Sequence, residues 1–195
     1  MARALEFDLE KALGKATRLF WKTGYVGTSL RDLLKSMGIG EGSFYNTFKS
    51  KKLVYLESLK RYNATVGRQR GEALFSAPTA KSGVRALFRC VLDGLDDPKE
   101  PSRLCLMAAS LTREVLAESD LRKYVHQQMS TLTEGMTARL AADKEAGLLP
   151  EEFDPQIVAP IIITYLQGIF RMALVSYDRA KFDRQIETFL VGLGL

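Results

Sequence analysis

The stretch between Leu30 and Phe48 constrains the fold of this chain more than any other. Its first half has apolar side chains spaced by three, four and seven residues, the pattern of a short amphipathic helix. These residues are Leu30, Leu33, Leu34 and Met37. Gly38 follows at once, where a helix favours a residue that tolerates positive φ. A second segment begins at Gly40 and can bury Phe44 and Phe48 on one face, so the stretch predicts two short helices joined by a turn.

The outer face of the second predicted helix is polar but poor in long charged side chains. Its residues are Glu41, Gly42, Ser43, Tyr45, Asn46 and Thr47. Two short helices around such a turn form a helix-turn-helix, whose second helix lies in a DNA major groove. Ser43 and Asn46, together with Glu41, are the candidates for contacts with base edges, since Asn can pair with adenine N6 and N7. Small neighbours such as Gly42 would let the backbone come close to the bases.

Charge is distributed unevenly along the 195 residues. Residues 1–75 carry 14 Lys and Arg against 7 Asp and Glu, whereas residues 76–195 carry 14 against 16. A basic excess confined to one end indicates that this end meets a polyanion. The candidates for phosphate contacts are Thr28, Ser29, Arg31, Lys49 and Lys51. Ser29 with Asp32 also approximates a capping box, and a helix start with free N–H groups is a natural phosphate seat.

The rest of the chain is helical in pattern, which predicts an all-α fold of about nine helices. Residues 1–52 form the predicted helix-turn-helix domain, and a long connecting helix follows at about 51–72. Ser76-Ala77-Pro78-Thr79 marks the boundary to a larger domain at 76–195, which includes a predicted helix at 104–116. The helix at 157–173 is too apolar for a half-exposed surface element.

Composition also restricts the compartment and the chemistry. No run approaches the roughly 18 apolar residues of a membrane helix, and the first eight residues lack the apolar core of a signal peptide. Two cysteines, Cys90 and Cys105, fit a reducing compartment. His126 is the single histidine and has no second ligand at metal-binding spacing. We therefore expect a cytoplasmic protein without a cofactor, a metal ion or a membrane partner.

The chain resembles the TetR family of bacterial transcriptional regulators over about residues 8–60. The match consists of Phe20-x-x-x-Gly24-Tyr25-x-x-Thr28-Ser29-Leu30, Leu33, Gly38-Ile39, Gly42-Ser43-Phe44-Tyr45, Phe48 and Lys51. The resemblance implies that Tyr45 and Lys51, with Thr28 and Ser29, contact phosphate. It further implies a homodimer through about 155–177 and 180–194, and a palindromic double-stranded DNA operator. A small-molecule effector would fill a cavity in the C-terminal domain and release the DNA.

Two positions depart from the family pattern. Gly40 stands where the family usually has Ser or Thr, and Glu41 stands where a basic residue is frequent. Three roles remain open for Glu41: accepting from a cytosine amino group, repelling phosphate, or stabilising the helix through its dipole.

Residues beyond the helix-turn-helix offer weaker signals. Effector contacts are expected from Phe88, Cys105, Met107, Tyr165 and Phe170, although an aromatic stripe also fits a core. Cys105 lies two residues after Arg103 and is either a redox- or electrophile-sensitive thiol or a small packing residue. Charge at Ile162 or Ile169 is expected to split the dimer. An effector-independent DNA binder is the alternative function, while no paired His or carboxylate supports an enzyme based on Cys105.

Overall fold

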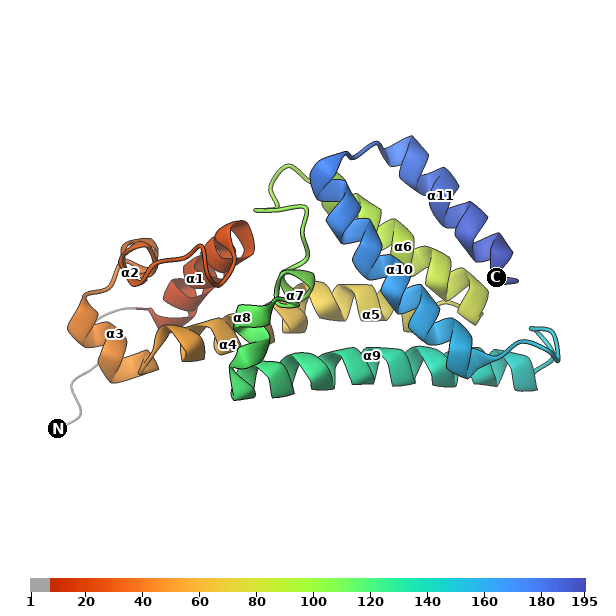
Figure 1. Cartoon of the computed structure of the whole chain (residues 1–195), viewed down its shortest axis with the longest axis horizontal. Helices are drawn as coiled ribbons and strands as arrows, with labels where there is room; N and C mark the ends of the chain where they lie inside the picture. Colours follow the sequence, from red (N-terminus) through yellow and green to blue (C-terminus); the bar gives the residue numbers. More distant parts are fainter. Residues whose placement is uncertain (1–7) are drawn as a thin grey trace. The chain divides into compact units, whose positions relative to one another are not determined.

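The computed structural model describes residues 8–195, in which all regular structure is helical (Figure 1). The predicted all-α fold is thus confirmed. Residues 1–7, on which the expectation of no signal peptide partly depends, lie outside the described residues. The chain divides into two compact units. One contains the described residues up to Val66 together with Cys105–Val125, and the other contains Gly67–Leu104 and His126–Leu195.

The first unit contains the helix-turn-helix. Its helices are α1 (Leu9–Thr23), α2 (Leu30–Met37), α3 (Glu41–Phe48), α4 (Lys51–Tyr62), α7 (Leu106–Ala109), α8 (Arg113–Ala117) and the beginning of α9 (Ser119–Glu145). Helix α1 packs against α2 and α4. Fully buried side chains at the centre include Phe20, Leu33, Phe44 and Tyr55. The rings of Phe20 and Tyr55 meet edge to face with centroids 4.9 Å apart, so α1 and α4 share one aromatic core.

Residues 105–125 are attached to this unit by polar contacts as well as by packing. The hydroxyl groups of Tyr55 and Ser110 lie 2.8 Å apart in the interior. Tyr62 donates to the sulfur of Cys105 at 3.4 Å. At the surface, Lys52 Nζ lies 3.4 Å from Glu118 and 3.2 Å from a carboxylate oxygen of Asp120. A segment distant in sequence therefore completes the unit that carries the helix-turn-helix.

The second unit contains α5 (Arg68–Phe75), α6 (Ala80–Asp96), α10 (Pro155–Val175), α11 (Arg179–Gly192) and most of α9. Helix α6 begins at a capping box in which Thr79 and Ser82 bond each other's backbone N–H groups. The buried carboxylate of Asp143 accepts a further bond from the backbone N–H of Ala80 at 2.6 Å. Because this carboxylate comes from the end of α9, it ties α9 to the start of α6.

Two predicted helices are interrupted. Helix α4 ends at Tyr62, and a π-helical turn at Asn63–Gly67 precedes α5. Within this turn the Thr65 hydroxyl lies 3.1 Å from the carbonyl oxygens of both Arg61 and Tyr62, to which it can donate. The predicted helix 104–116 is divided into α7 and α8. Thr112 lies between them and caps α8 by accepting from Val115 N. Residues 8–195 therefore contain eleven α-helices instead of about nine.

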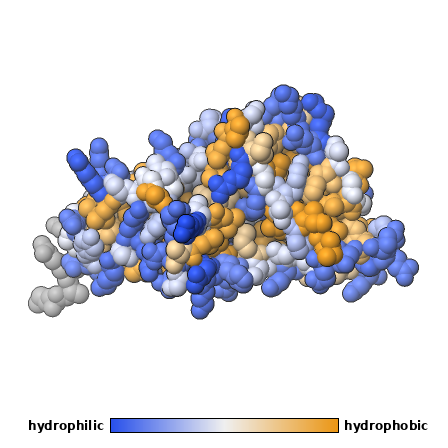
Figure 2. All heavy atoms as spheres, viewed as in Figure 1, coloured by the Kyte–Doolittle hydropathy of each residue, from blue (hydrophilic) through white to orange (hydrophobic). Residues whose placement is uncertain are grey.

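Helix α10 is apolar on nearly every side. By length and composition alone it could cross a membrane, which the sequence analysis did not anticipate. That evidence is weak, since core helices of soluble proteins pass the same test. Eight of its residues are buried in the second unit. The space-filling view nevertheless shows hydrophobic atoms gathered over α10 at the surface (Figure 2).

Candidate nucleic-acid interface

The start of α2 is held by a cap that uses two side chains. Ser29 Oγ accepts from the Asp32 backbone N–H at 3.1 Å, and its hydroxyl donates to the Asp32 carboxylate at 2.5 Å. This hydroxyl bond lowers the pKa of Asp32, and the nearby charges of Arg31 and Lys35 lower it further. Because the Ser29 hydroxyl already has an acceptor, the donors left for a phosphate are the backbone N–H groups of Leu30 and Arg31.

Thr28 lies inside the first unit rather than on its surface. Its side chain is 1% exposed. The hydroxyl donates to the Gly24 carbonyl at 2.7 Å and lies 2.7 Å from the Thr23 hydroxyl. Thr23 in turn donates to the Leu19 carbonyl at 2.8 Å. This chain of hydroxyl groups fixes the loop between α1 and α2, so Thr28 positions the start of α2 instead of offering its own hydroxyl to solvent.

The turn between α2 and α3 has the geometry that its sequence predicts. Gly38 adopts φ 73°, in the left-handed region, and its N–H bonds the Leu34 carbonyl at 2.9 Å. Gly40 then caps α3 without a side-chain bond. Phe44 is fully buried and Phe48 is 8% exposed, and these two rings anchor α3 on the unit. The polar face of α3, on the other side of the helix from these two rings, therefore points to solvent.

That opposite face brings together the predicted base-contacting residues, with Gly42 and the predicted phosphate-contacting Tyr45 beside them. Glu41, Gly42, Tyr45 and Asn46 are exposed and Ser43 is partly exposed. The Tyr45 ring, 45% exposed, packs edge to face on Phe44 with centroids 5.4 Å apart. Helix α3 contains no Lys or Arg, so its surface offers one carboxylate, an amide and several hydroxyl groups.

The lysines after α3 have three different environments. Lys49 ends α3 with φ 67°, as the one non-glycine residue of positive φ in the described chain, and it is exposed. The Lys51 ammonium lies 4.6 Å from the centre of the Tyr25 ring, and burial there lowers its pKa. Lys52 instead pairs with the carboxylates described above. Of these three lysines, Lys49 and Lys51 are therefore available to contact DNA. Nothing in the sequence indicated that the Tyr25 ring packs against Lys51.

The candidate effector residues do not lie in one unit. Phe88, Tyr165 and Phe170 belong to the second unit, whereas Cys105 and Met107 are buried in the first. The Phe88 and Tyr165 rings have centroids 5.9 Å apart. Tyr165 stacks on Phe189, which sequence reasoning missed, at 3.8 Å. The guanidinium of Arg70 lies 5.0 Å from the centre of the Phe170 ring.

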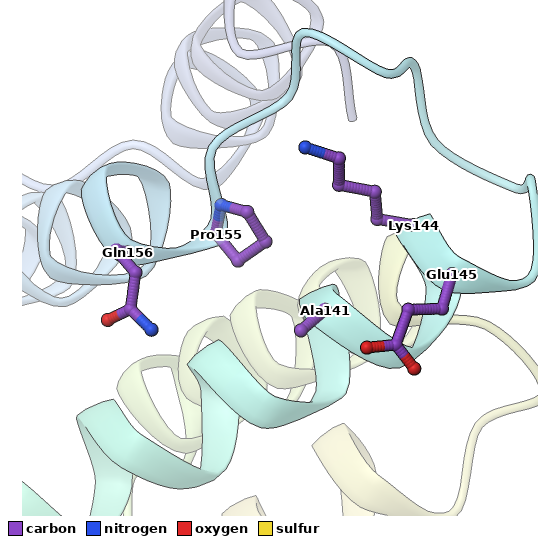
Figure 3. Close-up of a pocket in the computed structure, with 5 residues that line it drawn as sticks. All are labelled: Ala141, Lys144, Glu145, Pro155 and Gln156. Carbon is purple, nitrogen blue, oxygen red and sulfur yellow. The ribbon is translucent and has the colours of Figure 1, made fainter.

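The second unit also contains a hollow of about 380 Å³ between the end of α9 and the start of α10 (Figure 3). Its lining residues are Ala141, Lys144, Glu145, Pro155 and Gln156. None of these is a candidate effector residue. Across residues 8–195, no three His, Cys, Asp or Glu side chains come together as a group that could hold a metal ion.

The fold and the exposed face of α3 define a helix-turn-helix DNA-binding protein. Residues 12–57 match the bacterial regulatory proteins of the tetR family. An uncharacterized HTH-type transcriptional regulator, YezE of Bacillus subtilis, is 30% identical over 185 residues, which cover 94% of this chain and 93% of YezE. The chain therefore belongs to the TetR family, and the resemblance inferred from sequence is confirmed.

Other relatives and solved structures agree with this assignment. The HTH-type transcriptional repressor ComR of Escherichia coli is 23% identical over 93% of this chain and 85% of ComR. A cysteine mutant of the TetR family transcriptional regulator CifR, complexed with 26-bp double-strand operator DNA, has a TM-score of 0.85 and 30% identity, covering 97% of this chain and 98% of that one. The reduced form of E. coli NemR, at 22% identity and a TM-score of 0.78, shares the fold. The protein is thus a DNA-binding transcriptional regulator.

Proposed function

We propose that this regulator is a repressor that binds a palindromic operator as a homodimer and leaves it when a small-molecule effector binds. The exposed face of α3, fixed by Phe44 and Phe48 and followed by Lys49 and Lys51, is the observation that carries the proposal. Repressor function is also what the names of similar proteins state: ComR is a repressor, and IcaR of Staphylococcus aureus is a negative regulator of a biofilm operon.

The contacts with DNA divide into two kinds. Base edges would be met by Glu41, Ser43 and Asn46 on α3, which determine the sequence. Phosphates would be met by Tyr45, Lys49 and Lys51, and by the backbone N–H groups that follow Ser29. Arg31 is exposed in the first turn of α2 and can add a further phosphate contact. Phosphate contacts set the register and the salt dependence of binding.

The proposed dimer interface uses the exposed face of α10. Ile157 is 58% exposed, Ile161 40%, Met172 58% and Val175 81%. Together with Gly168 these positions recur every three, four or seven residues, so they form one stripe along α10. Val191 on α11, at 67% exposure, extends the apolar surface into the proposed interface at about 155–177 and 180–194. Water-exposed apolar surface of this extent favours burial against a second copy.

The residues suggested for an interface test from sequence alone belong to the opposite face of α10. Ile162 is 0% exposed and Ile169 is 3% exposed, within the core of the second unit. Charge at either position would therefore unfold the unit, and loss of the dimer would follow from loss of the fold. The exposed stripe supplies the informative positions instead.

The proposed effector would bind in the second unit. The aromatic residues Phe88, Tyr165 and Phe170 are the candidates there, and the resemblance to the family is what supports an effector at all. The regulator would act in the cytoplasm, where its DNA and a small metabolite are both accessible. No cofactor is required for such a mechanism, because release needs only differential affinity for two conformations.

The proposal is tested by selecting bound sequences from random duplex DNA. An inverted repeat is expected, since two-fold protein symmetry is mirrored in the site. Asn46→Ala should weaken binding to the selected site, whereas the matched variant Gln127→Ala at an exposed position of α9 should not. Metabolites are then screened for release of the DNA from the wild-type protein. Selection of single half-sites by a monomer, or binding without sequence preference, would contradict the proposal.

A second candidate function is a response to oxidants or electrophiles through Cys105. The observation that favours it is the hydroxyl of Tyr62, which donates to the Cys105 sulfur at 3.4 Å and so gives this thiol a polar partner in the interior. The side chain is 6% exposed, which favours the packing role instead. Loss of DNA binding after hydrogen peroxide, restored by dithiothreitol and absent in Cys105→Ser but present in Cys90→Ser, would support sensing. Equal loss in both variants would exclude it.

A further inference from the structure

The N-terminal end of α3 contains two glycines, Gly40 at the N-cap and Gly42 in the first turn. Gly40 has φ −77°, and neither Gly40 nor Gly42 adopts a positive φ. A Cβ atom added at either position would meet nothing within 4 Å. At the N-cap, Gly40 is itself a favoured residue, but inside the helix at Gly42 alanine would fit and is the better helix former. The fold therefore does not account for the missing side chain at Gly42, and the open space there allows an external group to come close to the backbone.

Glu41 lies between these two glycines and is the single charged side chain of α3. It is exposed, and no hydrogen bond or ion pair joins it to another described residue. Some other carboxylates of the same unit have partners: Asp32 is bonded to Ser29, and Glu57 pairs with Lys60 at 2.8 Å. The Glu41 carboxylate is thus available to an external donor.

From this geometry we propose that Glu41 determines specificity by accepting a hydrogen bond from the N4 amino group of a cytosine, with Gly40 and Gly42 allowing the close approach. The inference depends on the proposed function, in which α3 enters the major groove. An ionised carboxylate can only accept, and guanine O6 and N7 and thymine O4 are acceptors that would repel it. Cytosine N4 is the major-groove donor that Asp and Glu recognise, while adenine is matched better by an amide such as Asn46.

The composition of α3 supports the same conclusion. The commonest specific contact in the major groove joins Arg or Lys to guanine O6 and N7, and α3 has neither residue. The strand position that faces Glu41 should therefore be cytosine and should exclude guanine. Two other roles for Glu41 predict different results. Repulsion of phosphate would affect every sequence equally, and stabilisation of the helix dipole would affect stability without affecting base preference.

The test measures affinity for the selected operator and for all single-base variants of its half-sites. Wild-type protein should discriminate against the other bases at one cytosine by roughly 5- to 150-fold. Glu41→Gln should lose that discrimination at this base pair alone, and Glu41→Lys should change the preference to guanine at the same strand position. Glu152→Gln, an equal change of charge at an exposed residue of the second unit, should leave the base preferences unchanged.

The glycines are tested separately. Gly42→Ala should raise the thermal stability of the protein and weaken its affinity for the selected operator, because the added methyl group keeps α3 away from the bases. The control Gly71→Ala lies within α5, where the added Cβ makes ordinary contact with Phe75 at 4.0 Å, and it should leave DNA affinity unchanged. Unchanged operator affinity of Gly42→Ala would overturn the role given to the glycines.

The outcomes separate this inference from the function on which it depends. A uniform change of affinity in Glu41→Gln, or a lower thermal stability with unaltered base preferences, would overturn the role of Glu41 while leaving a sequence-specific repressor. Selection of no sequence by the wild-type protein would overturn the proposed function, and the inference with it.

Discussion

Introducing a carboxylate at Met172 tests the proposed dimer interface without disturbing the core. Met172 lies on α10 and is 58% exposed in the chain itself. Glu is unbranched and of similar length, so Met172→Glu keeps the helix and lets the new charge reach water in the monomer. In the proposed dimer, the same carboxylate would be buried without a partner.

The expected magnitude follows from the exposed fraction of this side chain. Full burial of a Met side chain is worth about 1.5–3 kcal/mol, so burying the exposed 58% contributes about 1–1.7 kcal/mol per protomer. Symmetry doubles this to about 2–3.5 kcal/mol. Two desolvated carboxylates add at least another ~2 kcal/mol of cost, as each unpaired buried charge costs several kcal/mol. A loss of about 4–5.5 kcal/mol raises the dimer dissociation constant by roughly 1,000-fold or more.

Sedimentation velocity over a range of concentrations measures this constant. Leu148→Glu is a matched control, because Leu148 is 57% exposed and lies outside the proposed interface. The control should remain dimeric, whereas Met172→Glu should sediment as a folded monomer with a normal circular dichroism spectrum. A Met172→Glu protein that stays dimeric at the wild-type constant would refute an interface on this face of α10.

Two further predictions concern the helix-turn-helix. Lys51→Ala should weaken binding to all DNA sequences and reduce the salt slope by about one unit, while Lys81→Ala at an exposed position of α6 in the second unit should not; an unchanged slope would show that Lys51 does not meet phosphate. Ser29→Ala should lower the free energy of unfolding by about 0.5–2 kcal/mol through loss of the α2 cap. Because Ser29 lowers the folded-state pKa of Asp32, the Asp32 part of this stability is present above about pH 4 and is lost as the pH falls through the folded pKa. Urea titrations should therefore show a smaller difference between wild type and Ser29→Ala at pH 2.5 than at pH 7, and a constant difference would exclude the Asp32 contribution.

The helix-turn-helix could be predicted from sequence because its signals are local. Gly38 requires only its own backbone to end α2, and Ser29 caps the helix that it precedes. The burial of Phe44 and Phe48 follows from a spacing of four residues on one short helix. Each of these features depends on neighbours within a few positions of the chain. The domain limits at 52 and 76 and the DNA-contacting residues remain predictions.

Features that depend on distant partners could not be predicted in the same way. Thr28 carries a hydroxyl beside a helix start, which fits a phosphate contact, but its loop folds inward and the hydroxyl bonds Gly24. Lys51 and Lys52 are adjacent and identical in type, yet one lies on the Tyr25 ring and the other pairs with Glu118. Nothing local distinguishes them.

Helix α10 shows a different limit of sequence analysis. Apolar residues occur on two of its faces, so a periodicity analysis finds Ile162 and Met172 equally acceptable as interface residues. The structure gives them opposite environments, at 0% and 58% exposure. When a helix is apolar all round, its sequence shows that both faces are covered by something, but only the packing of the chain shows which face is its own core.

The discontinuous make-up of the first unit limits how this protein can be recombined with its relatives. A chimera that exchanged residues up to 52 would carry Lys52 away from Glu118 and Asp120. An exchange up to residue 66 would separate the buried hydroxyl of Tyr55 from that of Ser110, and Tyr62 from Cys105. The folded unit that contains the helix-turn-helix is therefore encoded by two segments of the gene, and a recombination that exchanges this unit has to transfer both segments or rebuild the contacts between them.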